Sequence, residues 1–212
     1  MIPRNMVGVV GALLVVGCAS VPATRFYTLS TPSESSGVKD ASRLLQPSVP
    51  IFIEVMPVNV PERLARPQLV VRSAGSRAET QLSILEQDRW SSHFNYELRD
   101  AFANGIANRT GAVNRTGRIR APGQPSYRVA IELSRFDAIV GDKVQARFGW
   151  TITRSTDGSN AACYSEISES VGEGIDGVVK GVQRAVSSVA ADVSKNLIEL
   201  DTGQAATCAA QY

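Results

Sequence analysis

Strict alternation of apolar and polar residues marks long β-strands in the second half of the chain. Every second residue is apolar over 127–133 and again over 144–152, and a Gly-Asp-Lys turn at 141–143 separates the two runs. This pattern predicts an antiparallel hairpin with one buried face and one solvated face. The apolar phase shifts by one residue after the first run, which indicates a β-bulge near residues 134–135. A second turn at 157–158 leads into a further strand.

Two other segments repeat apolar residues every three to four positions, as amphipathic helices do. The first stripe begins at Trp90 and continues to Ile106, and the Thr-Gly pair at 110–111 ends it. Glu86 and Asp88 would then lie at the N-terminal end of this helix, where carboxylates complement the helix dipole. The second stripe covers 175–197 and is rich in valine. Because valine is a weak helix former, packing on a sheet must hold this helix.

The first half of the chain adds short strands. Segments rich in β-branched and aromatic residues lie at 25–29, 51–55 and 68–72, with a further candidate at 82–85. The resulting order is β-β-β-α-β-β-β-α. It predicts an α+β fold in which an antiparallel β-meander sheet carries two long helices on one face. We expect a single α+β domain over 51–200 and a C-terminal tail over 201–212.

The N-terminus has the features of a targeting segment. Arg4 precedes an apolar run over 7–16, which is too short to span a bilayer, since that needs about 20 residues. The following Val-Val-Gly-Cys sequence resembles a bacterial lipobox, in which the cysteine receives the lipid. We therefore predict a lipoprotein signal peptide over 1–17 and lipidation of Cys18. An ordinary signal peptide with an incidental cysteine is the alternative.

Residues 18–50 are rich in Ser, Thr and Pro, which is typical of a tether between a lipid and a domain. A short aromatic strand is expected within it at 25–30. A coil of about 30 residues has a mean span of roughly 30 Å. Ala19 stands where an aspartate would favour retention in the inner membrane. By resemblance to lipoproteins of double-membrane bacteria, we predict a lipid anchor in the outer membrane, with the domain on its periplasmic face.

Composition excludes several function classes. The 212 residues are 43% hydrophobic and carry a formal net charge of +2, so a folded domain is expected and a nucleic-acid partner is not. His93 is the single histidine of the sequence, which excludes a His-rich metal site. The sequence also lacks the Gly-X-Ser-X-Gly motif and the Gly-Lys-Ser/Thr sequence of a phosphate-binding loop. We expect no catalytic residues, no metal and no cofactor.

Two features leave alternatives open. Cys163 and Cys208 remain once Cys18 is lipidated, and in the oxidising periplasm they could form a disulfide or stay as two unrelated small apolar residues. The loop over 108–120 repeats Asn-Arg-Thr-Gly and contains four arginines, at 109, 115, 118 and 120. Contact with lipid phosphates or an acidic partner and an ordinary solvated loop are both consistent with it.

Four motifs together resemble a known family. They are Phe-Tyr-Thr-Leu at 26–29, Ile-Glu-Val-Met-Pro-Val-Asn-Val-Pro at 53–61, Leu-Ala-Arg-Pro-Gln-Leu-Val-Val-Arg at 64–72, and Glu-Gln-Asp-Arg-Trp at 86–90. They resemble the ABC-type transport auxiliary lipoproteins, the group that includes paraquat-inducible protein C. The resemblance implies a non-enzymatic outer-membrane lipoprotein that works with a mammalian-cell-entry (MCE) type lipid-transport system.

These observations lead to two functional hypotheses. The first is a docking component that binds a periplasmic MCE-type protein and can form a homo-oligomer. Arg63, Arg66, Gln68 and Arg72 are its candidate contact residues, with the three arginines expected to be exposed. The second is a lipid carrier or an assembly factor for outer-membrane proteins. A carrier needs a large apolar cavity between sheet and helices, whereas a docking component fills that space with side chains.

Overall fold

The computed structural model describes residues 22–30, 51–72, 81–115 and 126–208. The elements are β1 (Arg25–Tyr27), β2 (Phe52–Val55), the 3-10 helix η2 (Glu62–Leu64), β3 (Gln68–Val71), β4 (Ser83–Trp90), α1 (Phe94–Thr110), β5 (Val113–Asn114), β6 (Ser126–Ile139), β7 (Lys143–Arg154), β8 (Asn160–Ser170) and α2 (Gly174–Asp201). The predicted lipidation site Cys18, the tether over 31–50, and Arg118 and Arg120 lie outside the described residues.

The larger sheet has five strands in the order β5-β2-β6-β7-β8. β6, β7 and β8 form the predicted antiparallel meander, and their alternating apolar residues are buried on one face. β2 instead runs parallel to both β6 and β5. The pairing of β6 with β7 shifts register between Leu133 and Arg135, which confirms the predicted bulge.

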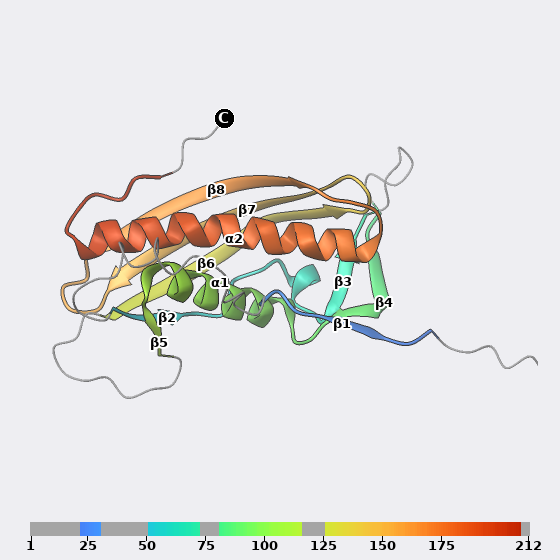
Figure 1. Ribbon diagram of the computed structural model, residues 1–212, viewed down its shortest axis with the longest axis horizontal. Coiled ribbons are helices and arrows are strands. Elements are labelled where there is room, and N and C mark those ends of the chain that lie inside the picture. The colour runs from blue at the N-terminus through green and yellow to red at the C-terminus, as the bar shows by residue number, and fades with distance from the viewer. Residues whose placement is uncertain (1–21, 31–50, 73–80, 116–125, 209–212) are drawn as a thin grey trace, which may run out of the picture.

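Both helices cover the same face of this sheet, as predicted (Figure 1). α2 packs over β7 and β8, while α1 packs over β2 and against α2. The two helices meet closely at Gly105, where an added Cβ would lie 2.9 Å from the Cβ of Ala190. α1 ends at Gly111, whose positive φ of 68° suits glycine, so the predicted helix stop is confirmed.

Of the first four strands only β2 joins the sheet of the meander, which corrects the expectation of one antiparallel sheet. β1, β4 and β3 form a separate three-stranded sheet in which β1 runs parallel to β4 and β3 runs antiparallel to it. The two sheets meet along β6, because Arg72 bridges to Ile139 beyond the end of β2. The fold is therefore α+β with two mixed sheets.

The first helix also starts later than predicted. Trp90 ends β4, and α1 begins at Phe94, so Glu86 and Asp88 lie in a strand rather than at a helix N-terminus. Pairing with β1 and β3 satisfies the backbone of this segment and outweighs its helical periodicity. Trp90 nevertheless lies in the core at 4% exposure, and its ring stacks on that of Phe94 with centroids 5.1 Å apart.

Hydrogen bonds and a disulfide fasten the C-terminal end of α2 to the sheet. The hydroxyl of Tyr127 donates to Asp201 Oδ1 at 2.6 Å, and Arg154 Nε donates to that hydroxyl at 3.0 Å. Arg154 also donates to the backbone carbonyls of Leu200 and Asp201, which close the helix. Burial and the bond to Asp201 raise the pKa of Tyr127 to about 12.

Cys163 on β8 and Cys208 in the tail are joined in the structure, with their Cα atoms 5.4 Å apart. This separation lies within the range that a disulfide requires. The tail is held at a second point by Asn196 and Glu199, which bind the backbone of Thr207. The tail is thus fixed to β8 and α2 as far as Cys208.

Candidate functional site

The segment that links the predicted lipid anchor to the domain is itself packed onto the domain. Arg25 of β1 forms an ion pair with Asp88 of β4 at 2.7 Å, and the hydroxyl of Tyr27 donates to the same carboxylate at 3.2 Å. The backbone N–H of Ser91 donates to the carbonyl of Tyr27 at 2.7 Å. Residues 25–27 are therefore a strand of the three-stranded sheet, although the sequence predicts them to belong to the tether.

A buried carboxylate holds the next two residues. Glu97, in the first turn of α1, is 5% exposed and accepts hydrogen bonds from Thr28 Oγ1 at 3.0 Å and from the backbone N–H of Leu29 at 3.1 Å. The hydroxyls of Ser91 and Ser92 donate to its other oxygen at 2.5 and 3.0 Å. Burial alone would raise the pKa of Glu97, but these four donors outweigh it and lower the pKa.

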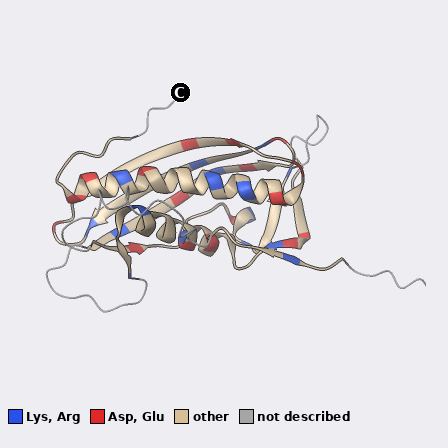
Figure 2. Cartoon of the chain, viewed as in Figure 1, with Lys and Arg blue, Asp and Glu red and all other residues tan. Residues whose placement is uncertain are grey.

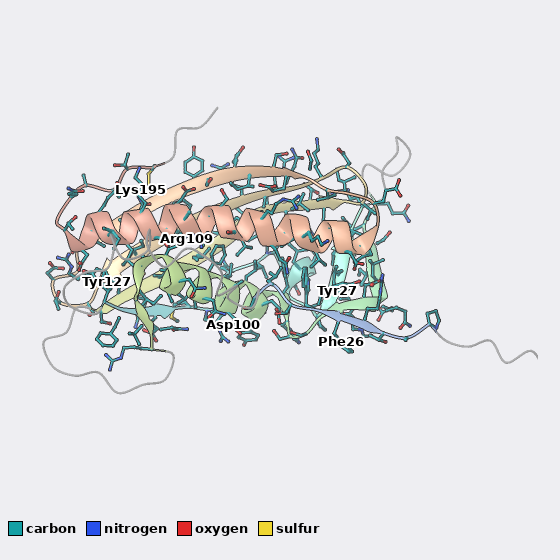
Figure 3. The ribbon with its side chains drawn as sticks, in the orientation of Figure 1. Phe26, Tyr27, Asp100, Arg109, Tyr127 and Lys195 are labelled. Atoms are coloured by element: carbon teal, nitrogen blue, oxygen red, sulfur yellow. A yellow bond between two sulfur atoms is a disulfide. The ribbon has the colours of Figure 1, made fainter. Side chains whose placement is uncertain are left out.

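The second helix completes this set of contacts. Gln183 of α2 donates to the carbonyl of Thr28 at 3.0 Å, and Asn104 of α1 donates to Ser30 Oγ at 3.3 Å. Residues 24–30 are thus hydrogen-bonded to both helices and to β4. We call this arrangement the anchor clamp, defined by Asp88, Ser91, Ser92, Glu97, Asn104 and Gln183. Figure 3 shows Tyr27 on the side of β1 that faces α2.

The predicted contact residues lie on η2, on β3 and in the residues that follow each of them, and they differ in exposure. Arg63 is exposed on η2, and no ion pair links it to the described residues. Arg72 is half-buried and its Nε donates to Asp137 Oδ1 at 2.9 Å. Gln68 donates to Glu86 at 3.3 Å, and Arg66 is half-buried. The expectation of three exposed arginines therefore holds for Arg63 alone.

Two buried polar atoms at this surface lack a hydrogen-bond partner among the described residues: Arg66 Nε and Asn95 Oδ1. The two residues come from adjoining places, since the carbonyl of Arg66 accepts from the N–H of Phe94 at 3.3 Å. An unsatisfied buried polar atom costs about 1–3 kcal/mol.

The space between the sheet and the helices is filled by side chains. Leu98, Phe102, Ile106 and Leu197 are fully buried, and the Phe102 ring meets that of Phe148 edge-on with centroids 5.4 Å apart. A hollow of about 380 Å³ does lie on the surface where α1 and α2 cross, but it is open to solvent and both polar and apolar side chains line it. It is lined by residues that include Asn104, Asn108, Arg109, Lys180, Gln183 and Arg184.

The two arginines in the described part of the basic loop, Arg109 and Arg115, make contacts within the domain. Arg109 donates to the carbonyl of Gly105 and to Ser187 Oγ at 3.0 and 2.8 Å. Arg115 lies over the Phe52 ring at 4.4 Å from its centroid. Basic and acidic residues are also interspersed over the visible face of the molecule (Figure 2). These two arginines therefore serve the packing of α1 and β2.

The described residues contain no cluster of three or more His, Cys, Asp or Glu side chains that could hold a metal ion. His93 is exposed at the start of α1 and makes no side-chain cap. None of the helices in the described ranges is both long enough and apolar enough to cross a membrane.

The anchor clamp was missed by the sequence analysis, although one signal for it was present. Glu97 lies three positions after Phe94 and four before Ala101, at the border of the apolar stripe of the first helix, and a carboxylate placed there needs hydrogen-bond donors when it is buried. The donors themselves come from residues 28–29 and 91–92, and their approach depends on the parallel pairing of β1 with β4. That pairing has no local sequence signature.

Comparison with known proteins yields one family match. The model of the family described as "ABC-type transport auxiliary lipoprotein component" matches residues 27–194. The match therefore covers the anchor clamp, both sheets and most of α2. No curated protein matches the chain.

Solved structures share the fold at low sequence identity. The crystal structure of an uncharacterized protein has a TM-score of 0.60 and 16% identity, over 83% of this chain and 99% of that one. A Xanthomonas campestris protein of the DUF330 family has a TM-score of 0.56 and 14% identity, over 87% of this chain and 98% of that one. At such identity these likenesses bear on the fold alone.

Proposed function

The chain belongs to the family of ABC-type transport auxiliary lipoprotein components, and on this premise we propose that it is a non-enzymatic docking component of an MCE-type lipid-transport system. In this proposal Cys18 carries the lipid, the anchor lies in the outer membrane, and the domain on the periplasmic side binds the MCE-type protein. The lipid-carrying role is the alternative.

The anchor clamp is the observation that carries the proposal. A docking component holds its partner at a defined distance from the membrane. The anchored segment therefore has to be fixed to the domain that binds the partner. Glu97 and Asp88 do this by binding Thr28, Leu29 and Arg25 from elements far away in the sequence. A carrier that shuttles a lipid gains nothing from such a connection.

The interior supports docking over carrying. A carrier would need an enclosed apolar cavity of about 300–1,000 Å³ to bury its ligand. Here the space between helices and sheet is taken up by large side chains such as Phe102 and Phe148. The surface hollow between α1 and α2 is open to solvent, and it mixes apolar side chains such as Val186 with amides and cations, so it does not enclose a lipid.

The surface on η2 and the start of α1 is the proposed partner contact. Arg63 offers an exposed cation on this surface. Arg72 is unsuited to a charge-reversal test, because a carboxylate there would face Asp137 and destabilise the fold. The partner in this proposal presents an acidic side chain to Arg63.

Affinity capture from cell envelopes tests the proposal. The mature lipoprotein is extracted with mild detergent, bound MCE-type protein is quantified by mass spectrometry, and bound phospholipid is measured in the same eluate. Arg63→Glu should reduce recovery of the MCE-type protein by about tenfold or more, as expected for loss of one interfacial charge pair. The matched control is Lys180→Glu, which reverses an exposed charge on α2, and recovery should stay unchanged.

Two results would argue against docking. Stoichiometric phospholipid without an MCE-type protein in the eluate would favour the carrier. Equal losses for Arg63→Glu and Lys180→Glu would show that net charge, and not the η2 surface, governs capture.

A further inference from the structure

The anchor clamp leaves very little chain between the lipid and the fold. β1 begins at Arg25, seven positions after the predicted lipidation site Cys18. Seven residues reach at most about 25 Å when fully extended. Because residues 24–30 are bound to β4, α1 and α2, the chain after residue 30 adds nothing to this reach. The tether of about 30 residues expected from the sequence is thus reduced to the seven residues 18–24, which we call the leash.

A short leash fixes which end of the molecule lies near the membrane. The chain enters the fold at the end that contains the three-stranded sheet, and the C-terminal end of α2 lies at the opposite end (Figure 1). α2 has 28 residues and is therefore about 42 Å long. The leash of at most about 25 Å is shorter than α2, so the far end of the five-stranded sheet cannot reach Cys18.

The end nearest the leash also carries an unusual apolar side chain. Phe26 of β1 is 66% exposed, the highest value among the large apolar side chains of the described residues. It lies on the side of β1 opposite Tyr27 (Figure 3), so it packs against neither helix. Phe is one of the side chains that helices lying on a bilayer direct into the boundary between headgroups and acyl chains.

We propose that the face of the three-stranded sheet around Phe26 rests on the phospholipid bilayer that holds the anchor. This inference rests on the proposed function, because it requires a lipid on Cys18. The seven-residue leash selects the bilayer as the occupant of this face, since the face cannot move far from it.

The charges on this face suit a surface contact held by the anchor. Arg25 is paired with Asp88 and Arg89 with Glu86, so the guanidinium groups beside Phe26 are largely neutralised. Attraction to anionic lipids is therefore weak, and one aromatic ring cannot hold a domain on a membrane by itself. The covalent lipid holds the protein on the bilayer, and Phe26 orients it.

Photo-crosslinking of the full-length lipoprotein tests this orientation. The crosslinker p-benzoylphenylalanine replaces Phe26 in one variant and Tyr164 in the control. Tyr164 is an exposed aromatic residue on β8, away from the leash. Each variant is reconstituted into vesicles of phosphatidylethanolamine and phosphatidylglycerol and irradiated. Mass spectrometry then measures adducts at the crosslinker and the lipid mass on Cys18 in one sample.

The expected result is a mass increase of one phospholipid at position 26 and none at position 164. If Cys18 is lipidated and the adduct at 26 is absent, is a second protein chain, or occurs equally at 164, the orientation is wrong while the proposed function stands. If Cys18 carries no lipid, both fail together.

A lengthened leash supplies the second variant. Twenty Gly and Ser residues inserted after Ser20 add a coil with a mean span of about 25 Å and leave the fold and the lipobox untouched. The phospholipid adduct at position 26 should then fall clearly below that of the parent. An unchanged adduct would show that the leash does not set the orientation and would overturn the inference.

Discussion

Removal of the carboxylate of Glu97 should release the anchored segment from the domain. In Glu97→Ala the hydroxyls of Thr28, Ser91 and Ser92 and the N–H of Leu29 all lose their acceptor. The hydroxyls can turn toward water, because these three residues are not buried. The N–H of Leu29 cannot, since Leu29 lies in the core.

The size of the effect follows from these contacts. An unsatisfied buried N–H costs about 1–3 kcal/mol, and a hydrogen bond to a charged group contributes about 1.5–3 kcal/mol. Counting the Leu29 N–H and the short bond from Ser91 as the two principal losses, we expect the free energy of unfolding to fall by about 3–5 kcal/mol. The remaining two hydroxyls should add little.

The pH dependence provides a second signature. The folded state lowers the pKa of Glu97 below its ordinary value, so the folded protein binds fewer protons at this group than the unfolded chain does. Stability from Glu97 is therefore complete above the unfolded pKa of about 4.3 and is lost as the pH falls through the lower folded pKa. Glu97→Ala should remove this acid-sensitive contribution.

Urea unfolding and amide hydrogen exchange measure both effects. Exchange at residues 28–30 should become much faster in Glu97→Ala, while exchange in β6 and β7 should follow the global loss of stability. Asp100→Ala is the matched control, because Asp100 is an exposed carboxylate on the same helix and its ion pair within the described residues is with its neighbour Arg99. It should change stability by less than about 0.5 kcal/mol. Unaltered protection of residues 28–30 in Glu97→Ala would refute the clamp.

Four further predictions concern stability and processing. Trp90→Ala should lower the free energy of unfolding by about 3–5 kcal/mol, as for other buried aromatics, and a melting temperature near that of the parent would contradict this. Reduction of the Cys163–Cys208 bond, which spans 45 residues, should cost about 4 kcal/mol, and non-reducing peptide mapping should recover the two cysteines as one linked pair. Tyr127 should ionise near pH 12 in the folded protein, and because the unfolded side chain ionises near 10, stability should fall between these values; an ultraviolet titration in which Tyr127→Phe removes no late-ionising group would contradict this. Mass spectrometry of the mature N-terminal peptide should find lipid on Cys18, and cleavage elsewhere would end the lipoprotein assignment.

Local patterns in the sequence predicted those elements that are specified by residues close together in the chain. The alternation over 127–152 predicted the hairpin of β6 and β7 together with its bulge, because cross-strand partners in a hairpin are set by the turn. The valine stripe predicted α2, and the Thr-Gly pair predicted the end of α1. In each case the information lies within a few residues.

Long-range pairing could not be predicted in the same way. Residues 86–90 have helical spacing but form a strand, because they pair with residues 25–27, which lie more than 60 positions earlier. The same pairing brings Thr28 and Leu29 to Glu97 and creates the anchor clamp. The ion pair of Arg72 with Asp137 also spans two sheets, which is why that arginine is less exposed than its sequence context suggested.

The most direct test of the central claim is a binding measurement between purified components. The mature lipoprotein is placed in phospholipid nanodiscs and titrated with the periplasmic part of the MCE-type protein produced by the same organism. We predict saturable binding that is weakened by Arg63→Glu and unaffected by Lys180→Glu, with no phospholipid held inside the folded domain. Absence of binding, together with one phospholipid retained per domain after nanodisc removal, would contradict it.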